Sequence, residues 1–173
     1  SILIISNQVP GQYKPNLSPF VIDQAKSIEH LGHKVTVIDC NPHNRAFLLA
    51  LVDFIGRLHK YLKKEKPSLI HIHCGGIWSF CASIISHSFP KVITFHGSDL
   101  LFGKDIIFGI KKTLFGVLLI RELLENFIAK LFSIFSIPFM DYVILVNNKQ
   151  IKKLLFDKKY KVQPCGVNTD TFK

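Results

Sequence analysis

The sequence predicts one α/β domain, a Rossmann-like, doubly wound parallel sheet with helices on both faces. Short runs rich in Val and Ile alternate along the chain with longer segments of helical periodicity, as expected for strands joined by crossover helices. The short runs are largely apolar at successive positions, which is typical of strands covered on both faces. At 173 residues the chain suffices for one domain with a sizeable core, and we assign residues 1–173 to it.

Six segments are predicted as strands because they combine β-branched residues with short length. The first five are Ile2–Ser6, Lys34–Ile38, Ser68–His73, Lys91–His96 and Tyr142–Val146. Tyr160–Gln163 is a weaker sixth.

Five helices are predicted between and beyond these strands. Gly32 is expected to end the first as a C-cap glycine, Pro67 and Pro90 follow the ends of the second and third, and Gly109 and Gly116 indicate breaks in the fourth. The predicted helices are Phe20–Leu31, Arg45–Lys66, Ile77–Ser88, Asp105–Ile137 and Asn147–Phe156.

Composition narrows the class of protein. With 48% hydrophobic residues and a mean hydropathy of +0.27, the chain is not disordered. Its 22 Lys and Arg against 12 Asp and Glu give a net charge of +10, which favours an anionic partner such as a phosphate or an acidic lipid. None of the usual nucleic-acid-binding patterns is present, so we expect no nucleic-acid partner. The four cysteines form no CxxC pair and are expected to be free thiols.

The apolar segments do not predict a membrane span. The first residues read as a buried strand rather than a signal peptide, and the longest uncharged stretch of the apolar region, Leu131–Met140, is far shorter than the roughly 20 residues that cross a bilayer. We therefore expect a cytoplasmic protein, at most peripheral at the inner face of the membrane. Phe108–Phe139 combines aromatic and basic residues, and it fits either core packing or an amphipathic surface on an anionic membrane.

Small, polar and hydrogen-bonding residues follow the predicted strands. Because parallel strands end at one edge of the sheet and ligands bind beyond that edge, these residues mark a candidate site. They are Asn7–Gly11, His73–Gly76, His96–Asp99, Asn147–Asn148 and Pro164–Val167.

His96 is the strongest candidate among them. It ends an apolar strand, where its ring can face the crevice and contact a sugar hydroxyl or an acceptor group. Gly97 lets the backbone turn close to a ligand, and Ser98 or Asp99 can cap the following helix. The alternative is a structural histidine beside an ordinary helix cap.

His71 and His73 lie two residues apart, so both point to one face of their strand while Cys74 points to the other. No further ligand completes a metal set, and we expect no metal. His73, at the strand end, is the likelier of the two to contact a ligand. Gly75 and Gly76 could offer backbone amides to a phosphate, but neither GxGxxG nor GxxxxGK[ST] is present, so an NAD-type Rossmann protein is the weaker reading.

Four stretches of the chain resemble the N-terminal domain of the family 4 glycosyltransferases, the retaining group with the GT-B architecture. They are FVIDQAKSIEHLGHKVTV, PSLIHIHCGG, VITFHGSDL and the pair DYVILVN with KVQPCGVNTDTF. The resemblance covers nearly the whole chain, in the expected order.

The resemblance implies an enzyme of two Rossmann domains that moves a sugar from a nucleotide-sugar donor to an acceptor hydroxyl, without metal or other cofactor. The domain seen here would hold the acceptor, a glycan or lipid-linked molecule in surface polysaccharide or glycolipid synthesis. It implies that His96 is the catalytic residue in the cleft and that the loop of Pro10 and Gly11 lies beneath the donor phosphates. The full set expected to bind substrate is Pro10, Gly11, His73, Gly75, Gly97, Ser98, Asp99, Asn147 and Gly166.

The chain departs from the family pattern in places. Ser18 stands where the family usually has glycine, Asn147 where it has serine, and Asn168 where it has aspartate. The chain also ends at Lys173, before the E-x₇-E element of the second domain, so we expect it to be inactive alone. The alternative is a non-catalytic acceptor- or membrane-binding subunit that pairs with a separate donor-binding chain.

Overall fold

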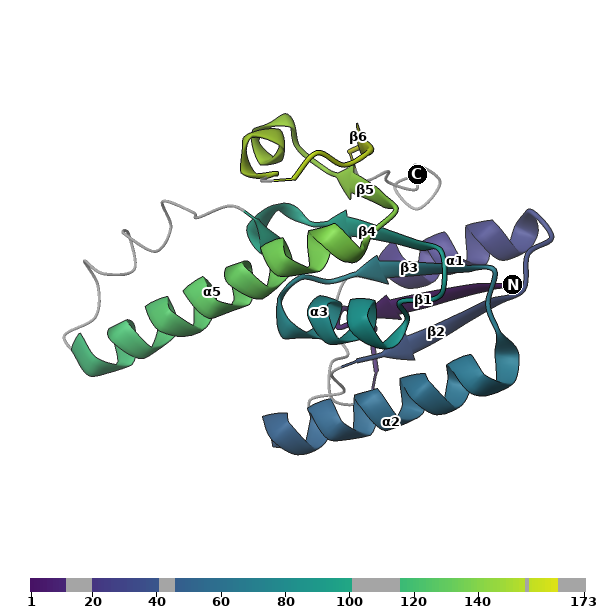
Figure 1. Cartoon of the computed structure of the whole chain (residues 1–173), viewed down its shortest axis with the longest axis horizontal. Helices are drawn as coiled ribbons and strands as arrows, with labels where there is room; N and C mark the ends of the chain where they lie inside the picture. The colour runs from purple at the N-terminus through teal and green to yellow at the C-terminus, as the bar shows by residue number, and fades with distance from the viewer. Residues whose placement is uncertain (12–19, 41–45, 101–115, 155, 165–173) are drawn as a thin grey trace, which may run out of the picture.

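The chain folds around one six-stranded parallel sheet, which confirms the predicted fold class (Figure 1). The computed structural model describes residues 1–11, 20–40, 46–100, 116–154 and 156–164. The strand order is β2-β1-β3-β4-β5-β6, so the chain starts in the sheet interior, moves to one edge, and then crosses back to build the other. This reversal of direction beside β1 is the place where open α/β sheets bind ligands.

The strands agree with the predicted segments to within a residue or two at each end. They are β1 Ile2–Ser6, β2 Val35–Asp39, β3 Leu69–His73, β4 Lys91–Phe95, β5 Tyr142–Leu145 and β6 Tyr160–Val162. The helices are α1 Phe20–His30, α2 Phe47–Glu65, α3 Gly76–Ile85 and α5 Gly116–Ser136, with short 3-10 helices η1 Gly97–Asp99, η2 Ile137–Phe139 and η3 Asn148–Lys153.

Helices cover both faces of the sheet (Figure 1). On one face, α2 places Ala50, Phe54, Leu58 and Leu62 at helical spacing against the sheet, and α3 adds Trp78. On the other face, α1 packs Val21 and Ala25 against Ile4 of β1, together with the partly buried side chains of neighbouring strands. This two-sided burial explains why the strands read as continuous apolar runs.

The helix ends follow from local chemistry. Gly32 has a φ of +87° and its amide donates to the Glu29 carbonyl at 2.9 Å, which confirms it as the glycine that ends α1. Lys66 ends α2 in the left-handed conformation, directly before Pro67. Of the predicted helix 105–137, the structure describes the part from Gly116 onward as α5; the predicted break at Gly109 lies outside the described residues.

Two predicted helices are wrong in extent or type. α3 ends at Ile85 rather than Ser88, because the buried Lys91 ammonium donates to the carbonyls of Ser86, His87 and Phe89 at 3.0, 3.2 and 2.8 Å. These bonds fix residues 86–89 in a turn.

The predicted α-helix over residues 147–156 is instead the six-residue 3-10 helix η3. Its i to i+3 bonds run from the Gln150 amide to the Asn147 carbonyl and from the Leu154 amide to the Ile151 carbonyl, each at 3.0 Å. The Gln150 side chain is turned inward, where it donates to the Phe95 carbonyl at 3.2 Å, and Leu154 resumes an extended conformation.

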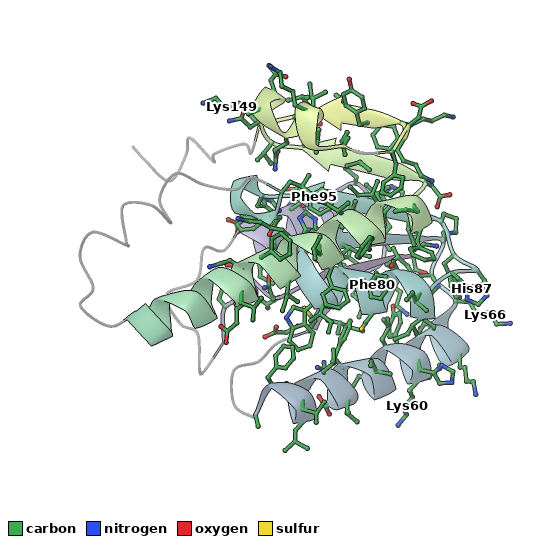
Figure 2. The ribbon with its side chains drawn as sticks, turned by 60° about the vertical axis from the view of Figure 1, so that its left-hand side comes forward. Lys60, Lys66, Phe80, His87, Phe95 and Lys149 are labelled. Atoms are coloured by element: carbon green, nitrogen blue, oxygen red, sulfur yellow. The ribbon has the colours of Figure 1, made fainter. Side chains whose placement is uncertain are left out.

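The side chains divide clearly between interior and surface. Figure 2 shows Phe95 inside the molecule and Lys60, Lys66, His87 and Lys149 at its surface. None of the helices built from the described residues has the length and apolar character needed to cross a bilayer.

Candidate functional site

A pocket of about 250 Å³ lies at the carboxyl edge of the sheet. Its walls come from the residues that follow β1, the first residue of α1, the ends of β3 and β4, and η1. The lining residues are Asn7, Gln8, Phe20, His73, Cys74, His96 and Asp99. Segments far apart in the sequence therefore meet here because parallel strands end together.

Ser6 shapes the wall contributed by β1. Its buried hydroxyl donates to the His73 carbonyl at 3.2 Å and accepts from the Gln8 amide at 2.9 Å. The first bond joins the ends of β1 and β3, and the second turns the chain directly after the strand. Together they position Asn7 and Gln8 at the pocket.

Three histidines form a connected series behind the pocket. His96 Nε2 lies 3.2 Å from His73 Nδ1, and His73 Nε2 lies 3.2 Å from His71 Nδ1. The series ends where His71 Nε2 lies 2.8 Å from the Thr94 hydroxyl. His71 and His73 share one face of β3, as predicted from their spacing, and Thr94 and His96 belong to the neighbouring strand and its end.

Burial keeps these imidazoles neutral. It lowers the pKa of His71 to about 4 and lowers the pKa of His73 well below its usual value. The pKa of His96 is lowered as well, again because its charged form would lose solvent. The histidine side of the pocket is therefore uncharged at neutral pH.

Asp99 closes the pocket from η1. Its carboxylate accepts from the His96 amide at 2.7 Å and from the Gly75 amide. Burial raises the pKa of this carboxyl to about 6, and the two backbone hydrogen bonds counteract part of that rise. The charge of the Asp99 carboxyl is therefore expected to change just below neutral pH.

Gly75 and Gly76 allow this close packing. A Cβ on Gly75 would lie 2.5 Å from the Ser133 hydroxyl and 2.9 Å from the Asp99 Cβ, and the Gly76 amide donates to Ser133 Oγ at 2.7 Å. Both backbone amides are therefore bonded within the protein. They position Asp99 and α5, and the structure offers no further evidence for the phosphate contact expected at Gly75.

Phe20 forms the aromatic wall. Its ring centroid is 4.6 Å from that of His96 and 6.4 Å from that of His73. Because Phe20 opens α1, this helix delivers the ring to the edge of the sheet while its next turn packs into the core.

The structure brings together only part of the predicted set. His73, His96 and Asp99 line the pocket. Gly97 follows His96 with a φ of +61° and no atom near its missing Cβ, so it serves the turn itself. Pro10 and Gly11 lie on the loop after β1 and are not among the lining residues.

The remaining predicted residues lie elsewhere. The exposed Asn147 caps η3, where its side-chain oxygen accepts from the Lys149 amide at 2.8 Å. Ser98 belongs to η1, and Gly166 lies outside the described residues. Substrate contact by these three stays a prediction.

Sequence reasoning missed several lining residues. Phe20 is predicted only as a helix residue. The segment Asn7–Gly11 is predicted to mark the site, but Pro10 and Gly11 are named there as substrate contacts, whereas Asn7 and Gln8, which follow β1 directly, line the pocket. Cys74 also lines the pocket, and its sulfur lies 4.0 Å from that of Cys40; among the described cysteines, Cys40, Cys74 and Cys81 are free thiols, as predicted.

The site shows no arrangement for metal binding in the part of the chain that the structure describes. No group of three histidine, cysteine, aspartate or glutamate side chains there is placed to hold an ion. The facing nitrogens of the three histidines are bonded to one another or to Thr94 instead.

Comparison with solved structures gives the fold. The chain is similar to the UDP-GlcNAc 2-epimerase from Methanocaldococcus jannaschii, with a TM-score of 0.54 and 10% identity over 93% of this chain and 44% of that one. It also resembles another UDP-N-acetylglucosamine 2-epimerase, with a TM-score of 0.49, 13% identity, and coverage of 93% and 47%. The chain thus spans less than half of either protein. At 10% identity, the likeness to the M. jannaschii enzyme shows the fold alone.

Comparison by sequence gives the family. No curated protein matched the chain, but the family model described as Glycosyltransferase Family 4 matches residues 18–171. That range runs from just before Phe20 to beyond β6, and it includes the three histidines, Gly75 and Asp99. The chain belongs to glycosyltransferase family 4.

Proposed function

We propose that this chain is the acceptor-side domain of a retaining glycosyltransferase, which transfers a sugar from a nucleotide-sugar donor to an acceptor hydroxyl. The observation that carries the proposal is the pocket at the carboxyl edge of the sheet, where His96 meets Phe20, His73 and Asp99. Family membership supplies the class of reaction. The assignment of this half to the acceptor rests on the family resemblance.

The chemistry of the pocket suits a sugar. Phe20 and the neutral ring of His96 offer flat apolar surfaces for the C–H face of a pyranose, and Asn7 and Gln8 offer amide groups for its hydroxyls. The volume of about 250 Å³ is below the roughly 300–1,000 Å³ of pockets that enclose drug-sized ligands. A single sugar ring therefore fits the site better than a whole nucleotide does.

This size supports a division of labour. We propose that the nucleotide of the donor is held mainly by a second Rossmann domain and that the described pocket receives the reacting sugar end. The acceptor would be a glycan or lipid-linked saccharide of surface polysaccharide or glycolipid synthesis, and no metal is required. These finer assignments follow the family resemblance.

A lipid-linked acceptor agrees with the exposed surface. Large apolar side chains are exposed at the start of α2, where Leu48 is 68% and Leu49 62% exposed, and on α5, where Leu124 is 55% exposed. The N-terminal ends of α2 and α5 lie on the same side of the molecule (Figure 1). Because the chain carries a net charge of +10, it should be attracted to an anionic surface, and we propose that this side of the molecule lies on an anionic bilayer.

Vesicle binding tests the membrane contact. The chain should sediment with vesicles that contain acidic lipid and much less with neutral vesicles, and replacing Leu48→Gln together with Leu49→Gln should weaken that binding. Equal and negligible sedimentation with both vesicle types would refute the contact without affecting the sugar site.

Substitution at the pocket tests the sugar site. In a protein that carries this domain together with a donor-binding domain, His96→Ala should lower kcat/KM for sugar transfer at least about tenfold, which is about 1.4 kcal/mol. The matched control is His87→Ala, since His87 is exposed beyond the far end of α3 (Figure 2). Equal activity of the two variants would remove His96 from the site.

The gene sequence after the Lys173 codon separates the enzyme from the alternative subunit. A continuing donor-binding domain supports the enzyme. A stop codon, with transfer activity recovered only when a separate donor-binding chain is added, supports the non-catalytic partner instead.

A further inference from the structure

The histidine series connects the pocket to a residue that does not line it. Starting at His96, the contacts pass through His73 and His71 and end on the hydroxyl of Thr94, with separations of 3.2, 3.2 and 2.8 Å. A neutral imidazole carries one N–H and one acceptor nitrogen. Once the protonated nitrogen of His96 is known, each contact therefore determines which nitrogen of the next ring carries its proton.

The first proton is fixed by η1. In the capping-box arrangement of this turn, the His96 side chain accepts from the backbone amide of Asp99 while the Asp99 carboxylate accepts from the His96 amide. Since Nε2 of His96 is directed at His73, the nitrogen that faces the Asp99 amide is Nδ1. An amide donor requires a lone pair opposite it, so the proton of His96 belongs on Nε2.

The remaining protons follow. His96 Nε2–H donates to His73 Nδ1, which places the His73 proton on Nε2. That proton faces His71 Nδ1, which places the His71 proton on Nε2, where it faces the Thr94 hydroxyl oxygen. The Thr94 hydroxyl is the last acceptor of the series.

The surroundings disfavour any charge on the series. His71 and His73 are almost fully buried, and desolvation lowers the pKa of all three rings. The other ionisable side chains that line the pocket are Asp99, whose carboxylate is bonded to two backbone amides, and Cys74, which packs beside Cys40. From α1, the pocket receives only the phenyl ring of Phe20.

We propose that two contacts together hold His96 in its neutral tautomer with the proton on Nε2: the Asp99 amide that faces Nδ1, and the Thr94 hydroxyl that accepts the last proton of the series through His73 and His71. Thr94, His71 and His73 are then positioning residues. His96 presents a fixed, uncharged ring to the ligand and takes no proton from the acceptor hydroxyl. The consequence for sugar transfer rests on the proposed function, whereas the proton positions do not.

The direct test is long-range ¹H–¹⁵N correlation of the imidazoles in the ¹⁵N-labelled chain at neutral pH. The expected result is Nε2–H in all three rings. Thr94→Val removes the last acceptor at nearly constant shape and should move His96 to a mixture of tautomers, although residue 94 does not line the pocket. Thr94→Ser keeps the hydroxyl and should restore the single tautomer.

Two outcomes would overturn the proposal. One is a His96 protonated on Nδ1 in the wild-type chain, a measurement that does not depend on the folding of any variant. The other is a Thr94→Val chain with native circular dichroism and an unchanged His96 tautomer.

A pH profile separates this proposal from the proposed function. If sugar transfer occurs, its pH profile should show no ionisation of His96 at neutral pH, because burial lowers the pKa of this ring, and Thr94→Val should alter the rate while Thr94→Ser recovers it. An absence of sugar transfer, with the tautomers as expected, would refute the proposed function and leave the tautomer assignment intact.

Discussion

The Cα of Gly75 lies so close to Asp99 that a Cβ on the glycine would be 2.9 Å from the Asp99 Cβ. This contact joins the end of β3 to η1 and holds the carboxylate where it accepts the amides of Gly75 and His96. The absence of a side chain at Gly75 therefore determines where the Asp99 carboxylate lies in the pocket wall.

Gly75→Ala should disturb both stability and the site. The new methyl group would also lie 2.5 Å from the Ser133 hydroxyl, so the end of β3, η1 and α5 must shift, and we expect a loss of about 1–3 kcal/mol in the free energy of unfolding. Urea denaturation measures it. The control is Gly56→Ala on exposed α2, where nothing lies within 4 Å and helix propensity predicts a gain of up to about 1 kcal/mol. Equal effects of the two variants would contradict the contact.

Acid should destabilise the fold through the buried histidines. His71 has a pKa of about 4 in the folded chain against an ordinary 6.5, so the unfolded chain binds the extra proton between these values. The stability that His71 contributes is complete above about pH 6.5 and is lost as the pH falls toward 4. For this residue the loss between about pH 7 and pH 5 is about 2 kcal/mol.

The His71→Gln variant isolates that term. Its free energy of unfolding, measured in urea at both pH values, should fall by about 2 kcal/mol less than that of the wild type. Asp99 acts in the opposite direction, since its raised pKa stabilises the folded chain as the pH falls from about 6, but this contribution is common to both proteins. Parallel pH dependences would contradict the neutral, buried state of His71.

Gln150→Leu should weaken the join between β4 and β5. The Gln150 amide oxygen accepts from the backbone amides of Val146 and Asn147 at 3.0 and 3.1 Å, and its nitrogen donates to the Phe95 carbonyl. Leucine leaves the buried Phe95 carbonyl and the two partly buried amides without this partner, and we expect a loss of about 1–3 kcal/mol in the free energy of unfolding. Lys149→Ala, on the exposed side of the same turn (Figure 2), should change stability by less than about 0.5 kcal/mol.

Lys91→Met should fray the end of α3. The substitution keeps the apolar stem but removes the ammonium that binds three carbonyls, and we expect a loss of about 1.5–3 kcal/mol. Hydrogen exchange at residues 86–89 should accelerate in parallel. Lys60→Met on the exposed face of α2 is the control, and similar losses in the two variants would show that a surface charge, not the carbonyl cluster, is responsible.

The sheet was predictable because its signal is local. Each strand is a short β-branched run between turn residues, and burial on both faces requires that composition. The carboxyl-edge rule then placed His73, His96 and Asp99 in one site without any knowledge of packing. Gly32 was predictable for the same reason, since a left-handed helix end depends on the residue itself.

The missed features depend on neighbours distant in sequence. From the sequence alone, Lys91 is expected to be a surface cation, but in the structure its ammonium binds carbonyls of residues 86–89. Likewise, Gln150 is expected to be a polar helix residue, but its side chain donates to the Phe95 carbonyl. Phe20 reads as an ordinary apolar start of a helix. Its role at the pocket arises because α1 is anchored by Val21 and Ala25, which no periodicity reveals.

The pairing of β3 with β4 aligns His71 with Val92 and Ile72 with Ile93. Side chains alternate along a strand, so a displacement of one residue between these strands would turn Phe95 and His96 toward the opposite faces of the sheet. The strand alignment that packs Phe95 in the core therefore also places His96 at the pocket. Natural variation at this edge should accordingly replace individual side chains and leave the alignment of the two strands untouched.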